Sequence, residues 1–262
     1  MKKGEAKHYY EYANLISIMK EAGYHTYWIS NQETAGIDGS TARLYAELSD
    51  ERYFTMLRDS TTSNRVPDGK LLNLLDECLA KSYGKNFYVL HLEGTHEDYK
   101  LRFPSSYSHF KAEDEEGISI QAKEHRADYD NAVLYNDYVI EEIIRRFEDK
   151  NAILVYFSDH GSEVYEGRDF MGHSSEEEGN RHMIEIPFII WRSKIFAEKN
   201  PDLDVKIASS ADNPYMTDDF IHTLLDILRI RTEDYSPYKS IINDKFDVTR
   251  PRIYSNKEYH KE

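Results

Sequence analysis

The sequence predicts an α/β fold: a mostly parallel sheet with helices on both of its faces. Short apolar runs of branched and aromatic residues recur along the 262 residues, as buried strands do. Stretches with helical periodicity separate these runs, and strands joined through such helices pair in parallel. Because 40% of the residues are apolar, the chain can bury a large core, and we expect one domain over residues 1–262.

The first half of the chain alternates helices and strands in this prediction. Apolar side chains at Leu15, Ile16 and Met19 follow helical spacing, and Gly23 ends that helix. A polar, glycine-bearing loop, "NQETAGIDGS", follows the first strand. The predicted elements are a helix at 9–22, a strand at 24–30, helices at 42–57 and 70–81, and a strand at 86–94.

The second half continues the alternation. The clearest helix covers 121–148, and its predicted apolar face consists of Tyr129, Val133, Ile140, Ile144 and Phe147. Strands are predicted at 153–157 and 186–192. A late helix at 217–228 has Thr217 as its expected N-cap and two acidic residues in its first turn.

Composition excludes several classes of partner. The chain has 48 acidic and 33 basic residues, a formal charge of −15, which repels nucleic acid and anionic lipid. No run reaches the roughly 18 apolar residues of a membrane span, so the chain is predicted to be soluble. The single cysteine, Cys78, follows the apolar spacing of its helix, which favours a packed thiol over a reactive one. An internal disulfide is therefore impossible, but the compartment stays open.

A candidate metal site follows the apolar run at 153–157. The run stops abruptly at Ser-Asp-His-Gly, which indicates a buried strand that ends in a tight turn. Asp159 and His160 would then lie at the carboxyl end of a strand, where α/β sheets bind ligands. A carboxylate oxygen beside an imidazole nitrogen suits zinc.

Two further histidines are predicted to converge on the same sheet edge. His96 follows the strand at 86–94, and His173 lies in the loop that leads to the strand at 186–192. Asn31 would face the same rim, where its amide could bind a polar substrate group or cap its own loop. We interpret the other histidines, His182 included, as surface or core side chains.

These residues carry a resemblance to a known family. "YWISNQ", "LHLEGTHEDYKLRFP", "VYFSDHGSEVYEG" and "MGHSS", in this order, together with "YDNAVLYNDYVIEEII" and "TDDFIHTLLDIL", resemble the catalytic domain of the phosphoethanolamine transferases. That family lies within the sulfatase and alkaline-phosphatase-like superfamily. Ser-Asp-His-Gly alone is shared with sulfatases and phosphoglycerol transferases, so the order of the blocks is the more specific signal.

The resemblance implies a reaction and its participants. It implies transfer of phosphoethanolamine from a phospholipid donor to a cell-envelope glycan or lipid A acceptor, through a phospho-threonine, with zinc or another divalent metal. Asp159 and His160 would hold the metal. His96 and His173 would hold the phosphoryl group, a second zinc or the proton of the leaving group. Family members carry this catalytic domain outside the cytoplasm on an inner-membrane anchor.

One departure from the family pattern concerns the beginning of the chain. The family places an acidic metal ligand and a threonine nucleophile upstream of the "YWISN" strand, but only 27 residues precede Trp28 and they read as one helix. We therefore expect a sulfatase-like fold that is incomplete at the N-terminus, with weak metal binding and no activity in the isolated chain. The membrane segment would be missing as well, and a homodimer could cover the exposed surface.

Two alternatives remain open at this point. The chain could belong to a sulfatase or a phosphoglycerol transferase of the same superfamily. It could also be a non-catalytic module that keeps the fold for metal binding or for contact with a partner.

Overall fold

The computed structural model describes residues 13–33, 40–56, 66–81, 83–117, 119–173, 180–254 and 257–259. The chain divides into two compact units: Met1–Glu115 with Lys123–Glu142, and Glu116–Ala122 with Ile143–Glu262. The prediction that both make up one domain stays a prediction. Residues 9–12 of the first predicted helix, most of the polar loop at 31–40, and Ser174 and Ser175 lie outside the described residues.

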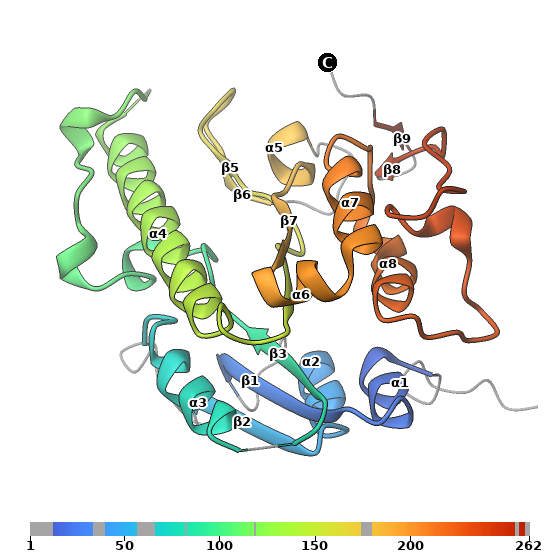
Figure 1. Cartoon of the computed structure of the whole chain (residues 1–262). Helices are drawn as coiled ribbons and strands as arrows, with labels where there is room; N and C mark the ends of the chain where they lie inside the picture. Colours follow the sequence, from blue (N-terminus) through green and yellow to red (C-terminus); the bar gives the residue numbers. More distant parts are fainter. Residues whose placement is uncertain are drawn as a thin grey trace, which may run out of the picture. The chain divides into compact units, whose positions relative to one another are not determined.

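The first unit contains a parallel sheet in the order β2-β1-β3 (Figure 1). Because β1 is central, the chain goes to one side for β2 and crosses to the other side for β3. The carboxyl ends of β1 and β3 therefore form a topological switch point, where open α/β sheets bind ligands. The strands are β1 (His25–Glu33), β2 (Glu51–Met56) and β3 (Asn86–His91), and the helices before α4 are α1 (Leu15–Glu21), α2 (Ser40–Ala46) and α3 (Lys70–Leu79).

The central strand is buried on both faces, as the sequence predicts. Tyr27 and Ile29 alternate with Thr26 and Ser30, and all four side chains are at most 1% exposed. Successive side chains of a strand point to opposite faces, so both faces of β1 are covered. The ring of Tyr27 also stacks on Tyr88 of the neighbouring β3, with ring centroids 4.8 Å apart.

The helix predicted at 42–57 is wrong over its second half. The structure ends α2 at Ala46 and places β2 at Glu51–Met56, paired in parallel with β1. The run Arg52, Tyr53, Phe54 and Thr55 is rich in aromatic and β-branched residues, which favour the pleated surface of a sheet. Tertiary pairing with β1 therefore decided the conformation of a segment whose apolar spacing resembles a helix.

The long helix exists, but its buried face differs from the predicted one. Helix α4 (Ile120–Arg145) starts at Ser119, whose hydroxyl accepts a hydrogen bond from the Ala122 amide. Val133 of the predicted face is 43% exposed, whereas Ala132, Tyr135 and Val139 are buried. Alanine adds little to an apolar pattern, so the prediction missed the stripe on which α4 packs. Three 3₁₀ turns precede the helix at Tyr99–Leu101, Ser105–Tyr107 and Ala112–Asp114.

The second unit is built around an antiparallel pair, β4 (Ile153–Phe157) with β7 (Phe188–Arg192). The sequence predicts both strands, and their antiparallel pairing is an exception of the kind that a mostly parallel arrangement allows. A core of buried apolar side chains lies among the helices of the unit: Phe196, Leu203, Ile207, Ile227, Ile241 and Ile242. The other elements are β5 (Glu163–Val164), β6 (Met171–Gly172), α5 (Arg181–Ile184), α6 (Lys194–Lys199), α7 (Pro201–Ser209), α8 (Phe220–Ile227), β8 (Ile253–Tyr254), β9 (Lys257–Glu258), and 3₁₀ turns at Thr217–Asp219 and Pro237–Lys239.

The late helix begins later than the sequence predicts. Thr217 is the first residue of a 3₁₀ turn, and α8 follows with Asp219 at its N-cap and without a side-chain capping bond. The expectation that Thr217 caps this helix is therefore wrong. Asp219 is instead buried, and its carboxylate forms ion pairs with Lys239 and Arg250. These two cations explain its burial better than the positive polarity of the helix start does.

Candidate functional site

His96 lies in a tight turn directly after β3, at the switch point of the first unit. The His96 amide donates to the Glu93 carbonyl at 3.2 Å, which closes the turn. Gly94 has a φ of 57°, in the left-handed region that favours glycine. The His96 side chain is exposed.

A buried carboxylate, Asp68, fixes this turn to the start of α3. Its two oxygens accept hydrogen bonds from the backbone amides of Glu93 and Gly94, at 3.0 and 2.7 Å. Burial raises the pKa of the Asp68 carboxyl, and these hydrogen bonds oppose that shift. Asp68 thus holds two backbone donors of the turn that would otherwise need water.

Asn31, at the carboxyl end of β1, is fully buried and belongs to the same network. Its amide nitrogen donates to Asp68 Oδ1 at 2.7 Å and to the Val66 carbonyl at 2.8 Å, while its amide oxygen accepts from the Thr55 hydroxyl. These contacts give Asn31 a structural role in joining β1 to β2 and to the segment before α3, and they test neither of the two roles left open from the sequence. Direct contact between Asn31 and substrate stays an untested prediction.

Asp159 and His160 follow β4 in the second unit. His160 Nδ1 lies 2.8 Å from the Gly161 carbonyl oxygen. A carbonyl oxygen only accepts, so Nδ1 carries the hydrogen and Nε2 of the neutral ring keeps its lone pair. That is the tautomer in which a metal-binding histidine is usually held. His160 Nε2 is 3.8 Å from the Asp159 carboxylate, whose side chain is 89% exposed.

A short hairpin returns His173 to His160. Strands β5 and β6 pair Glu163 with Gly172 and Val164 with Met171. This antiparallel register brings the residues just before β5 opposite those just after β6. The His160 and His173 rings stack with centroids 3.6 Å apart and an interplanar angle of 27°.

Gly161 packs against α5 without room for a side chain. Its amide donates to the Met183 carbonyl at 2.9 Å. A Cβ at this position would lie 2.1 Å from the His182 carbonyl oxygen and 3.1 Å from that of Glu185. The glycine of Ser-Asp-His-Gly is therefore required by close backbone approach, and it supplies the carbonyl that orients His160.

The structure brings together three of the five predicted site residues. Asp159, His160 and His173 lie near one another in the second unit. His96 and Asn31 lie in the first unit, so their convergence with the other three stays a prediction. Over the described ranges, no set of three or more His, Cys, Asp and Glu side chains is arranged to hold a metal.

Sequence reasoning missed two side chains that support the turn after β3. They are Asp68 and Arg102, whose guanidinium donates hydrogen bonds to the His96 and Glu97 carbonyls. Arg102 lies six residues after His96 within the quoted block "LHLEGTHEDYKLRFP". An arginine in a strand-end loop of a strongly acidic chain was the available signal. Asp68 had no comparable signal, because its partners come from β1 and from the turn after β3.

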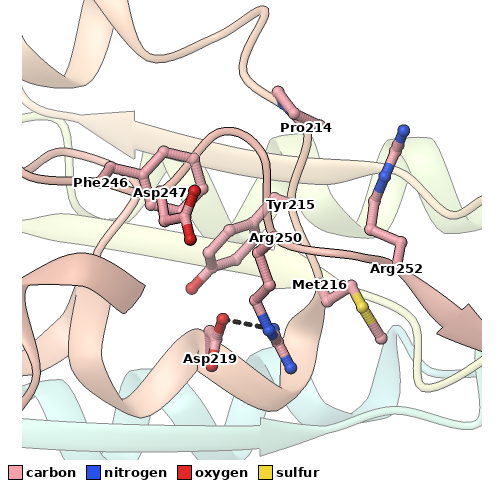
Figure 2. Close-up of a pocket in the computed structure, with 8 residues that line it drawn as sticks. All are labelled: Pro214, Tyr215, Met216, Asp219, Phe246, Asp247, Arg250 and Arg252. Carbon is pink, nitrogen blue, oxygen red and sulfur yellow. Dashed lines mark hydrogen bonds and ion pairs between the residues drawn. The ribbon is translucent and has the colours of Figure 1, made fainter.

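A small pocket in the second unit contains none of the predicted site residues (Figure 2). Arg250 reaches Asp219 there, and its guanidinium also bonds to Asp218, with Nη1 3.0 Å from Oδ1. Lys239 Nζ lies 3.2 Å from Asp219 Oδ1 as well. Two carboxylates already neutralise Arg250, and Arg252 is the second arginine in the lining of this pocket. We interpret these ion pairs as a tie between the C-terminal segment and α8.

Comparisons with known proteins agree with the fold. The sulfatase family profile matches residues 5–230. Phosphoethanolamine transferase EptC of Escherichia coli is 34% identical over 242 residues, which is 90% of this chain and 41% of that protein. The Kdo(2)-lipid A phosphoethanolamine 7''-transferase of Escherichia coli is 26% identical over 72% of this chain and 33% of that protein. The chain thus spans less than half the length of these relatives. No helix in the described part of the chain is both long and apolar enough to cross a membrane.

A solved structure gives the same result. The C-terminal periplasmic domain of Escherichia coli EptC, crystallised in complex with Zn, superposes with a TM-score of 0.82 at 33% identity, over 90% of this chain and 66% of that one. The predicted sulfatase-like α/β fold and the resemblance to phosphoethanolamine transferases are thereby confirmed. The chain belongs to the sulfatase family.

Proposed function

We propose that this chain forms part of a metal-dependent phosphoethanolamine transferase. The observation that carries the proposal is the similarity to EptC over 90% of the chain, joined to an Asp-His pair and a stacked second histidine after β4. The donor would be a phospholipid, and the acceptor a glycan or lipid of the cell envelope. By the same similarity, the domain would act outside the cytoplasm, on a protein anchored in the inner membrane.

Asp159 and His160 are donor types that zinc accepts, and they supply two of the three or four protein ligands that it usually takes. His160 offers the lone pair of Nε2, and the exposed Asp159 carboxylate offers oxygen, both accepted ligand types for this metal. When bound, a divalent metal neutralises phosphoryl oxygens and lowers the pKa of a hydroxyl nucleophile. Another divalent metal that prefers nitrogen and oxygen ligands would fit these two groups as well.

The histidines would handle the phosphoryl group and its protons. His173 stacks on His160, which places an imidazole next to the proposed metal ligands. An imidazole there can donate a hydrogen bond to a phosphoryl oxygen, accept a proton as the neutral ring, and give that proton to the leaving group from the protonated ring. His96 would contribute the same chemistry from the switch point of the first unit, if the two units bring these residues together as the sequence predicts.

Ligand binding by the chain tests the proposal. O-Phosphoethanolamine, glycerol phosphate and inorganic sulfate are titrated separately, with zinc, while the histidine ring resonances are followed by NMR. We expect O-phosphoethanolamine to shift the His160 and His173 resonances most, and the substitution His160→Gln to abolish the effect on His173. A preference for sulfate or glycerol phosphate would favour the sulfatase or phosphoglycerol alternative. No response to any of the three would favour a non-catalytic module.

A further inference from the structure

The side chain of Arg102 is almost completely buried, although it is charged and lies in a surface loop after β3. It is 3% exposed, and the Glu93 carboxylate lies 2.6 Å from its Nη1. Burying an arginine is costly unless its donors are satisfied. The contacts of Arg102 therefore indicate what the arginine is for.

Three nitrogens of the Arg102 guanidinium contact one short segment, residues 93–97. Nη1 pairs with Glu93, Nε donates to the His96 carbonyl at 3.0 Å, and Nη2 donates to the Glu97 carbonyl at 2.6 Å. The planar fork of a guanidinium can hold acceptors in different directions at once, which a single ammonium cannot do. These hydrogen bonds use the backbone of His96 and not its exposed ring.

Asp68 holds the other side of the same turn. It accepts from the amides of Glu93 and Gly94, whereas Arg102 donates to the carbonyls of His96 and Glu97. An anion therefore binds the donors of the turn and a cation binds its acceptors, both from buried positions. Fixing backbone groups from two directions leaves the turn few alternative conformations.

We propose that Arg102 is a positioning residue, which, with Asp68, fixes the turn so that the His96 imidazole is presented at the carboxyl end of β3. This inference rests on the role proposed for His96 and deepens it. Arg102 itself touches no substrate in this account. Because Arg102 orders the turn in advance, His96 would lose less conformational entropy on binding a phosphoryl group.

Hydrogen exchange measured by mass spectrometry tests the inference in the intact chain. The variants are Arg102→Lys, which keeps the charge beside Glu93, and Arg102→Gln, which removes it. The matched control is Arg52→Lys, because the side chain of Arg52 forms an exposed ion pair with Glu47, at 2.8 Å. We expect exchange of residues 93–97 to accelerate about tenfold or more in both Arg102 variants, since charge-assisted hydrogen bonds are lost. Exchange in α3 and exchange in the control should change little.

Two results would overturn the inference. Unchanged exchange at residues 93–97 in Arg102→Lys would show that charge alone suffices and that the fork is not needed. Equal acceleration in the turn and in α3 would show that Arg102 supports the whole unit and has no specific role in the turn. If Arg102→Gln fails to fold, the comparison between Arg102→Lys and Arg52→Lys still decides.

The His96 ring resonance separates this inference from the proposed function. We expect one sharp resonance in the parent chain, and a broadened or shifted one in Arg102→Lys but not in Arg52→Lys. An unaltered resonance in Arg102→Lys would count against positioning. O-Phosphoethanolamine is then added to the parent chain: if His96 does not respond while the exchange result holds, the role of His96 fails and the role of Arg102 in ordering the turn stands.

Discussion

The two strand-end turns that carry candidate histidines are held by different means. The turn after β3 is fixed by buried charged side chains, Asp68 and Arg102, which bind its backbone amides and carbonyls. The turn after β4 is fixed by backbone packing, in which Gly161 lies against α5 and orients His160 through its own carbonyl. The first turn should therefore be sensitive to loss of a side chain, and the second to gain of one.

The largest expected effect comes from adding a methyl group at Gly161. A Cβ there would meet two backbone carbonyl oxygens, which cannot move aside as a flexible side chain would. We expect Gly161→Ala to lower the free energy of unfolding by about 2–3 kcal/mol, as overpacking does. The matched control is Gly84→Ala, where a Cβ has no atom within 4 Å. Urea unfolding of both variants checks this, and equal stability would show that the turn adjusts freely.

Removal of one of the Asp68 acceptors that hold the turn after β3 should lower the stability of the chain by an intermediate amount. Asp68→Asn replaces a carboxylate oxygen with an amide group that donates, so one of the backbone amides of Glu93 and Gly94 loses its partner. We expect a loss of about 1–3 kcal/mol in the free energy of unfolding, the usual range for an unsatisfied buried group. The exposed Asp169→Asn serves as control. A variant as stable as the parent would mean that water replaces the lost bond.

Acid should weaken the first unit through Asp50, at the other end of its sheet. Burial raises the pKa of Asp50, but hydrogen bonds from Lys20 and Thr26 outweigh it and lower the pKa from 3.8 to about 2. A lowered folded-state pKa contributes stability above the unfolded pKa, and this contribution is lost as the pH falls from 3.8 towards 2. Asp50→Asn should therefore flatten the decline of stability in this window. The measurement is the urea midpoint of the parent and of Asp50→Asn at several pH values in this window. The same dependence of the midpoint on pH in both proteins would contradict the assignment.

The smallest expected effect is the reaction of the Cys78 thiol with an external reagent in the native protein. Its side chain is fully buried in α3, and burial raises the pKa of the thiol to about 11, so the sequence-based prediction of a packed thiol is supported. We expect Ellman's reagent to leave the native chain unmodified over minutes and to react with one thiol per chain in urea. Rapid modification of the native protein would show that α3 opens readily. Asp68 lies just before α3, so it would then hold the turn after β3 less firmly than we propose.

The fold and part of the site could be predicted from the sequence because each depends on local signals. The apolar run at 153–157 and the motif after it placed Asp159 and His160 correctly at the end of β4. The sequence predicts that His173 lies near His160, but not that their rings stack. That contact depends on the register of β5 with β6, two strands of two residues each, which are too short to show a periodicity. Asp68 accepts hydrogen bonds from backbone amides that are distant in the sequence, and no spacing pattern records such contacts. Arg102 donates to carbonyls only five and six residues before it, but no periodicity distinguishes it from other loop arginines.

Zinc titration calorimetry tests the central claim most directly, namely that Asp159 and His160 are metal ligands of a sulfatase-family site. The parent chain is compared with Asp159→Asn, His160→Gln and the control Asp169→Asn, an exposed carboxylate between β5 and β6. We expect the parent chain to bind zinc weakly, because Asp159 and His160 supply only two of the three or four protein ligands that zinc usually takes. We predict that each of the two site substitutions weakens this binding further, at least about tenfold, because even loss of groups outside the first coordination sphere typically costs that much. The control should bind as the parent does. Equal affinity in all four proteins would contradict the account.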